Sequence, residues 1–300
     1  MGFRFAVSNL KCELVFGLIL FLGSSRAVAQ SPAAHDDIAT IIQRSVEANN
    51  RDWKADPSFD YFERDRSPDG TKTYAVTNIL GTPYERLIEV NGKPLSAQQK
   101  DEEQKKFDAM VSQRRAETPE QRAQRIAKYE ADRKRDYEML EQVTKAFDFK
   151  LQGEQKIGQR KVYMLKATPH RGYHPPNRDT EVLPGMEGRL WIDEATYQWV
   201  KVEAHVIHAV SIEGFLAQVE PGTRFELEKA PVQDDIWLPI HYAMKASAKV
   251  LFLFPHHSQD DEAYFNYHPS PANSSNQSSE SPQSTPNEAS PYAHSRPANR

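Results

Sequence analysis

Ten histidines are the side chains of this sequence with the most obvious chemical potential. His170 and His174 are four residues apart, a spacing that places two zinc ligands on one face when the segment is helical. Pro169, Gly172 and Pro175 surround this pair, however, and residues of these types prevent a regular helix. The two histidines are therefore predicted to lie in a solvated loop, and we predict no metal site.

The other patterns of catalytic residues are also missing from the sequence. No serine stands in a Gly-x-Ser-x-Gly turn, and the glycines are scattered singly rather than gathered into a phosphate-binding loop. The acidic run Asp260–Glu262 is interpreted as the solvated start of a strand, not as a catalytic pair of carboxylates. We predict no catalytic residue, no cofactor and no enzymatic activity. A hydrolase is the alternative, and detectable esterase or peptidase turnover would support it.

The first 29 residues have the pattern of an export signal. Arg4 and Lys11 supply positive charge ahead of an apolar run, Leu14–Gly23, and residues 27–29 (Ala-Val-Ala) match a signal peptidase site. This run of ten residues is too short to span a membrane, which needs about 20; an uncleaved anchor is the alternative. We expect cleavage after Ala29 and a periplasmic or secreted protein, without stable transmembrane insertion.

The composition of the mature chain excludes several classes of partner and site. The full chain has 38 basic and 42 acidic residues, and loss of Arg4, Lys11, Arg26 and Glu13 leaves 35 against 41, a net charge of −6. An acidic balance gives no electrostatic attraction to phosphate backbones, so we expect no nucleic-acid partner. The only cysteine, Cys12, leaves with the signal, so the mature chain has no disulfide.

Three segments outside the strands have distinct compositions. Residues 36–50 are predicted to form a short amphipathic helix that ends at Asn49-Asn50. Residues 96–147 hold 12 basic and 11 acidic residues, and capping boxes at Ser96 and Thr118 predict a helical hairpin that is solvated for most of its length. Residues 269–300, with nine serines and six prolines, predict a disordered tail.

Residues 30–268 are predicted to form one mainly β domain. About ten segments alternate with the two-residue period of a strand and are joined by short turns. In the hairpin Arg189–Ile207, for example, Val200 and Val202 are expected on one face and Trp199 on the other. The pattern predicts a strongly curved antiparallel sheet, or unclosed half-barrel, with an N-terminal helix and the helical hairpin inserted between strands.

Some predicted strands are apolar on both faces, which a sheet packed on one side does not require. Either the second face is covered, so that the core is filled and sealed by the N-terminal helix, or it lines a cavity. The candidate cavity residues come from these strands and from the hairpin: Met164, Leu165, Val200, Val202, Phe252 and Phe254.

Three stretches resemble the periplasmic lipoprotein-carrier superfamily, with its LolA/LolB-like fold. They are Met186–Val206 (MEGRLWIDEATYQWVKVEAHV), Trp237–Met244 (WLPIHYAM) and Asn91–Phe107 (NGKPLSAQQKDEEQKKF). The first two resemble a hairpin and a later strand of that superfamily, and the third resembles a charged insertion of exported relatives. The resemblance implies an unclosed barrel with helices at its mouth, which binds acyl chains on its concave side. The insertion is longer than in the well-studied carrier, and no ligand-contacting residue can be carried over.

We therefore expect a non-catalytic periplasmic protein that binds or carries a lipid or a lipid-modified protein. Burial of one CH₂ group is worth ~0.8 kcal/mol, so a modest apolar trough can hold a lipid tail reversibly. The alternative is an envelope scaffold protein with a filled barrel core, which would dock a protein partner through residues 96–147.

Overall fold

The structure, a computed structural model, describes residues 36–212, 217–250 and 254–271. The predicted signal peptide and residues 272–300 of the predicted tail lie outside these ranges. Its helices are α1 (Ile38–Ala55), α2 (Ala97–Arg115) and α3 (Pro119–Ala146), with short 3-10 helices η1 (Asp56–Ser58), η2 (Arg178–Thr180) and η3 (Leu183–Gly185).

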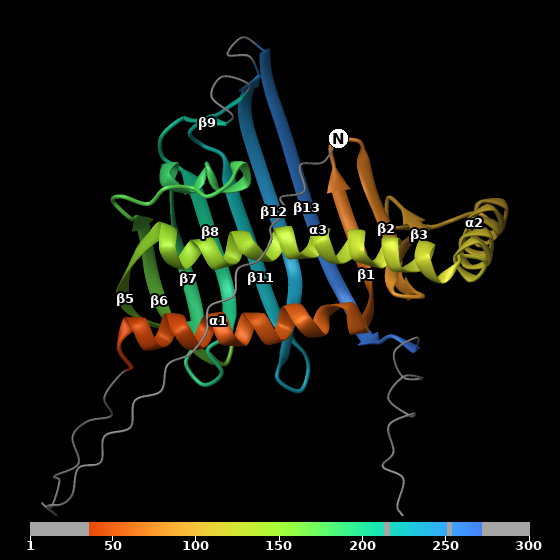
Figure 1. Cartoon of the computed structure of the whole chain (residues 1–300), viewed down its shortest axis with the longest axis horizontal. Helices are drawn as coiled ribbons and strands as arrows, with labels where there is room; N and C mark the ends of the chain where they lie inside the picture. The colour runs from red at the N-terminus through yellow and green to blue at the C-terminus, as the bar shows by residue number, and fades with distance from the viewer. Residues whose placement is uncertain (1–35, 213–216, 251–253, 272–300) are drawn as a thin grey trace, which may run out of the picture.

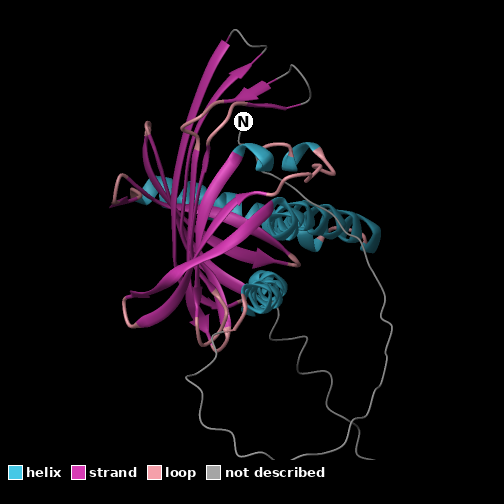
Figure 2. Cartoon of the chain, turned by 90° about the vertical axis from the view of Figure 1, so that its left-hand side faces the viewer, coloured by secondary structure: helices cyan, strands magenta, loops and turns pink. Residues whose placement is uncertain are grey.

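Thirteen strands form one antiparallel sheet, which Figure 2 shows as a curved layer. Eleven follow the order β4-β3-β2-β1-β13-β12-β11-β8-β7-β6-β5, and β10 joins β9 to β12. Because β4 and β5 do not pair, the sheet is unclosed, and the predicted half-barrel with an N-terminal helix and inserted helices is confirmed. The strands are β1 (Phe59–Ser67), β2 (Gly70–Ile79), β3 (Thr82–Val90), β4 (Lys93–Pro94), β5 (Phe147–Ile157), β6 (Arg160–Pro169), β7 (Met186–Asp193), β8 (Trp199–Val206), β9 (Val210–Ile212), β10 (Ala217–Val219), β11 (Arg224–Gln233), β12 (Ile236–Val250) and β13 (Phe254–Pro269).

Helix α1 is longer than the sequence pattern predicts. Its N-cap is Asp37, whose carboxylate accepts a hydrogen bond from the Thr40 N–H (2.8 Å). The helix does not end at Asn49-Asn50, because Asn49 is buried and its Nδ2 donates to the Ser45 carbonyl oxygen (2.8 Å) within the helix. Asparagine often ends a helix because its side chain can bond to the backbone in a turn. Here the Asn49 side chain bonds to the helix backbone instead, and the helix continues to Ala55.

Helices α2 and α3 start at the two predicted capping boxes. The hydroxyls of Ser96 and Thr118 each accept from a backbone N–H three residues later, and the glutamine side chains at those positions return the bond. Helix α2 is exposed along nearly its whole length. The prediction that the insertion is mostly solvated is wrong for α3, which crosses the sheet on the same face as α1 (Figure 1). Tyr129 of this helix is partly buried, and Tyr137 is buried.

The β2–β3 turn receives both inserted helices. Leu80 and Gly81 have φ values of +51° and +98°, a region that glycine enters without steric cost. A Cβ atom at Gly81 would lie 2.8 Å from the Ile126 Cδ1 atom of α3, so the bare glycine lets the helix approach the turn.

Arg114 joins the end of α2 to this turn. Its side chain is buried, and its guanidinium donates three hydrogen bonds to the backbone. The acceptors are the carbonyl oxygens of Ile79 (2.9 Å), Thr82 (2.7 Å) and Pro83 (3.1 Å). In α3, Arg125 donates to the Thr82 hydroxyl (2.6 Å) and forms two bonds with Glu117. One end of α3 is thereby fixed over β2 and β3, and its other end continues directly into β5.

Strand β6 shows what covers its two apolar faces. Tyr163 and Leu165 pack against Ile41 of α1 in one buried cluster. Val162 and Met164 alternate with them and belong to a second cluster, together with Trp237. Protein atoms therefore cover both sides of this strand, and its two-sided apolar pattern reflects packing of the fold itself.

The β7–β8 hairpin departs from strict alternation. The pairing places Trp191–Ile192 opposite Trp199–Lys201, which leaves Val200 as the extra residue of a β-bulge. Val200 lies in the second cluster, whereas Val202 packs against the first, beneath α1. The prediction that these two valines share a face is wrong, because the bulge shifts the alternation by one residue.

Strand β13 extends the fold beyond the predicted domain limit at residue 268. Pro269 pairs with Phe59 of β1, and the Ser270 N–H donates to the Ser58 carbonyl oxygen (2.8 Å). Ser270 is buried. The first two residues of the serine- and proline-rich segment are thus attached to the sheet.

Candidate functional site

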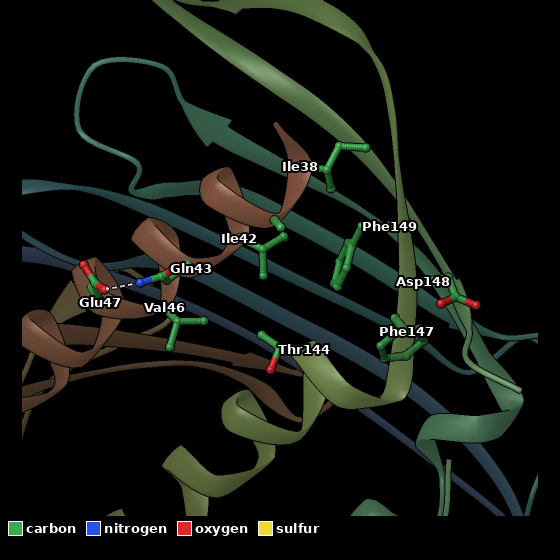
Figure 3. Close-up of a pocket in the computed structure, with 10 residues that line it drawn as sticks. Ile38, Ile42, Gln43, Val46, Glu47, Thr144, Phe147, Asp148 and Phe149 are labelled. Carbon is green, nitrogen blue, oxygen red and sulfur yellow. Dashed lines mark hydrogen bonds between the residues drawn. The ribbon is translucent and has the colours of Figure 1, made fainter. Parts of the chain in front are cut away.

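A groove of about 750 Å³ lies between α1, the C-terminal end of α3 and the edge strand β5. Its apolar wall consists of Ile38, Ile42 and Val46 from α1 and of Phe147 and Phe149 from β5 (Figure 3). The volume falls in the range of about 300–1,000 Å³ that is usual for ligand pockets.

Helix α1 supplies one wall because it carries two adjacent apolar stripes. Ile41 belongs to the buried stripe, which packs on the sheet. Ile38, Ile42 and Val46 follow each other at intervals of four residues, lie on one side of the helix and stay partly exposed. Ile42 of this second stripe also packs against the core cluster of Ile41, but all three side chains keep part of their surface exposed beside the groove.

The opposite wall comes from the junction of α3 with β5. Ala146, the last residue of α3, is fully buried, and the chain turns directly into the strand. Phe147 and Phe149 alternate along β5 and therefore point to the same side. Figure 3 shows both rings directed towards Ile42 and Val46, with Asp148 pointing away.

The rim of the groove is polar and acidic. Glu47 accepts a hydrogen bond from Gln43 (3.1 Å), and the Asp148 carboxylate contacts the Nδ1 atom of His170 (2.8 Å). Glu47 and Asp148 are the charged residues among the described residues that line the groove, and neither lysine nor arginine is part of that lining. The site is therefore an apolar trough with negative charge at its margin.

A buried ion pair fixes the C-terminal half of α1 to the sheet. The Lys229 Nζ atom of β11 lies 2.5 Å from an Asp52 carboxylate oxygen and 2.8 Å from Asn49 Oδ1. The other Asp52 oxygen accepts from Gln198 Nε2 and from the Trp237 N–H, each at 3.0 Å. Burial lowers the pKa of the Lys229 ammonium, an effect that the Asp52 carboxylate opposes.

Aromatic contacts join α1 to α3 behind the groove. The guanidinium of Arg133 lies between the rings of Trp53 (4.7 Å) and Tyr129 (5.7 Å) and donates to the Trp53 carbonyl oxygen. The Trp53 and Tyr137 rings are 4.8 Å apart. Burial raises the pKa of Tyr129 and of Tyr137 to about 12, so both phenols remain neutral at physiological pH.

The structure does not bring the predicted cavity residues together around the groove. Leu165 is fully buried beneath α1, and Val202 packs against the same cluster. Met164 and Val200 belong to the cluster on the other side of β6. These four residues lie in two different clusters, and none of them lines the groove.

The remaining two predicted residues cannot be placed in the same way. Phe252 lies outside the described residues, and Phe254 begins β13 without a described side chain. Apolar positions 38, 41, 42 and 46 have the spacing of a single apolar helix face, so the sequence shows that they share a side of α1 but not that part of this side stays exposed. No sequence signal shows that Phe147 and Phe149 would lie beside them.

The histidines are dispersed over the fold. His170 and His174 lie in the predicted loop, which is confirmed between β6 and η2. Within the described ranges, no group of three or more histidine, cysteine or acidic side chains could hold a metal ion. No helix in the same ranges is both long and apolar enough to cross a membrane.

Comparison with known proteins finds similarity at the level of structure. No family model and no curated protein matches the chain. The chain is similar to a LolA superfamily protein, NE2245, from Nitrosomonas europaea, with 10% identity over 76% of this chain and 91% of that one and a TM-score of 0.29. A putative outer membrane lipoprotein-sorting protein domain from Vibrio parahaemolyticus has 11% identity over 76% and 92%, also with a TM-score of 0.29. A MucA/MucB complex structure from Pseudomonas aeruginosa has 11% identity over 75% and 99%, with a TM-score of 0.20.

The strand order and the helices of the chain define its fold. An unclosed barrel with helices is the architecture that the sequence resemblance implies, and the described chain has an unclosed antiparallel sheet with an N-terminal helix and inserted helices. The fold of the chain is a half-barrel of this kind.

Proposed function

We propose that the groove binds the acyl chain of a lipid or of a lipid-modified protein. The protein then acts as a non-catalytic binding or carrier protein in the periplasm, after removal of residues 1–29. One observation carries the proposal: α1 keeps a whole apolar stripe partly exposed, and two phenylalanines of β5 face it across a groove of about 750 Å³. A flexible hydrocarbon chain is the ligand class that suits such a trough, because the affinity rises by ~0.8 kcal/mol with each CH₂ group buried.

Binding of a fluorescent fatty acid by the mature chain tests this proposal. Ile42→Glu places a charge in the middle of the groove wall, and we expect the dissociation constant to rise at least tenfold. Ile240→Glu is the matched control, because Ile240 is a large apolar residue of β12 that is 37% exposed and takes no part in the groove. The proposal would be overturned if the wild-type chain did not bind the fatty acid, or if the two variants bound it equally well.

Native mass spectrometry of protein purified from its own envelope provides an independent measurement. The expected result is a population of molecules with the added mass of a lipid or of an acylated polypeptide. This population should be reduced in Ile42→Glu and kept in Ile240→Glu.

The scaffold function remains a second candidate because α2 is exposed along nearly its whole length. Deletion of residues 96–147 cannot separate the two functions, since Thr144 of α3 lines the groove. Charge reversal at Lys105 and Lys106 on α2 avoids this problem. The scaffold function predicts that chemical cross-linking no longer joins this variant to an envelope protein that the wild-type chain contacts. Its fatty-acid binding should be unchanged.

A further inference from the structure

The two ends of the sheet are built differently. At one end β4 has only two residues, and α2 packs on β3 through a hydrogen bond from Arg86 to Gln104 (2.7 Å) and through the Tyr84 and Phe107 rings. Short edge strands and covering helices are common means of preventing further strand pairing. At the other end β5 has eleven residues and pairs with β6 alone.

The register of β5 shows which backbone groups point outward. The His170 N–H donates to the Ala146 carbonyl oxygen (2.7 Å), which makes this pair a hydrogen-bonded one. In an antiparallel ladder, hydrogen-bonded and non-hydrogen-bonded pairs alternate. Pairs 148/168 and 150/166 are then hydrogen-bonded, whereas the N–H and C=O groups of Phe149 and Leu151 point away from β6. Pro169, which has no N–H, stands opposite Phe147 in a non-hydrogen-bonded pair, as this register requires.

The outward backbone groups and the apolar groove belong to the same residues. Phe149 directs its ring into the groove and its N–H and C=O groups to the free edge. Among the described residues no hydrogen bond reaches these groups. The regular part of the edge runs from Phe147 to Leu151, where a bulge interrupts the pairing.

We infer that an extended polypeptide segment pairs with the β5 edge as an added strand, with apolar side chains in the groove and a basic residue near its rim. Unpaired main-chain donors and acceptors next to a groove that accepts alternate side chains are the elements of strand addition. The charge of the segment follows from Glu47 at the groove rim and from Asp148, which points to the opposite face of β5, where the alternate side chains of an added strand lie. The inference rests on the proposed function, since the segment would be the polypeptide part of the acylated partner.

A synthetic octapeptide of alternating leucine and lysine, measured by fluorescence anisotropy, tests the pairing. Two further peptides carry N-methyl groups on all leucines or on all lysines, which removes the donors of one edge of the peptide strand. We expect one N-methylated peptide to bind at least tenfold more weakly and the other to bind within about twofold of the parent. Loss of binding by the peptide with methylated leucines indicates antiparallel addition, because in an antiparallel ladder the residue opposite Phe149 both points to the groove and hydrogen-bonds to Phe149. Loss of binding by the peptide with methylated lysines indicates parallel addition.

Three results would overturn the inference: no binding of the parent peptide, equal weakening by both modifications, or weakening by neither. Asp148→Asn should weaken binding of the parent peptide several-fold at low salt, because the lysines of the added strand lie on the face of β5 to which Asp148 points. Asp101→Asn on the exposed face of α2 is the control and should leave binding unchanged.

Fatty-acid binding by the same protein, without peptide, separates this inference from the proposed function. If the fatty acid binds but both N-methylated peptides bind like the parent peptide or are weakened equally, strand addition is wrong and the groove is a lipid site alone. If the peptide shows the one-edge pattern but no fatty acid binds, strand addition stands and the acyl-chain function is wrong.

Discussion

Asp52 is the residue on which three elements of this fold meet. Its carboxylate, 2% exposed, accepts hydrogen bonds from Lys229 on β11, from Gln198 before β8 and from the backbone of β12. A buried ion pair adds little net stability relative to apolar packing, but removal of one partner leaves an uncompensated charge in the interior. The pair therefore positions α1 rather than simply strengthening the fold.

Lys229→Ala is expected to lower the free energy of unfolding by about 3–5 kcal/mol, because Asp52 is left buried without its counter-charge. Urea denaturation measures this change. The double variant Asp52→Asn/Lys229→Met should be clearly more stable than the single variant, and Lys245→Ala, at an exposed position of β12, should differ little from wild type. A single-variant loss below about 1 kcal/mol, as at a surface ion pair, would contradict this account.

Glu117 makes the junction of α2 and α3 sensitive to acid. Its carboxylate receives two hydrogen bonds from Arg125 (2.7 and 2.6 Å), which hold the pKa of Glu117 below its usual value of 4.5. A lowered folded-state pKa means that the contribution to stability is present above pH 4.5 and is lost as the pH falls through the lowered value. We expect faster hydrogen exchange at the start of α3 at pH 3 than at pH 6, after correction for the intrinsic rates. Glu117→Gln should abolish most of this difference.

At the scale of elements, α3 is a helix whose sequence is charged but whose position is internal. It spans the sheet from the β2–β3 turn to β5, and each end is fixed by a different device: hydrogen bonds to the turn at one end, and direct continuation into a strand at the other. Its inner side meets α1 through aromatic rings. Movement of α3 would therefore alter the groove through Phe147.

Arg114→Ala is expected to cost about 2 kcal/mol or more, since hydrogen bonds of a charged donor contribute about 1.5–3 kcal/mol each and three carbonyls lose their partner. Hydrogen exchange should accelerate in α2 and in the first turns of α3, while α1 keeps its protection. The neighbouring Arg115→Ala, at an exposed position, serves as the control. Equal exchange in the two variants would show that the β2–β3 turn does not hold the helices.

For the whole molecule, the groove places the proposed ligand between α1 and the continuous α3–β5 segment, which are distant in sequence. A ligand that binds only the folded chain raises its stability by mass action, by about 2.7 kcal/mol at a concentration one hundred times the dissociation constant. We expect a saturating fatty acid to raise the melting temperature of wild type and of Ile240→Glu by several degrees. A clearly smaller shift is expected for Ile42→Glu, because its weaker binding gives less stabilisation at the same ligand concentration. A shift of the same size in this variant would place the ligand elsewhere.

Local sequence patterns determined most elements of this protein. The caps at Asp37, Ser96 and Thr118 are set by side chains within three residues of the helix start, and the turns and strands follow from equally local periodicity. The class of the fold was predictable for the same reason, because many short alternating strands without crossover helices lead to an antiparallel curved sheet.

Only the tertiary structure decided where α3 lies, which residues form the groove and which strand remains an open edge. Val200 changed its cluster through a bulge, and Phe147 and Phe149 met α1 through contacts about one hundred residues apart in the chain. Periodicity specifies that a residue alternates with its neighbours, but it does not specify which face will be covered or by what. That choice depends on long-range packing, in which α1 uses one apolar stripe to seal the sheet and leaves the other beside β5.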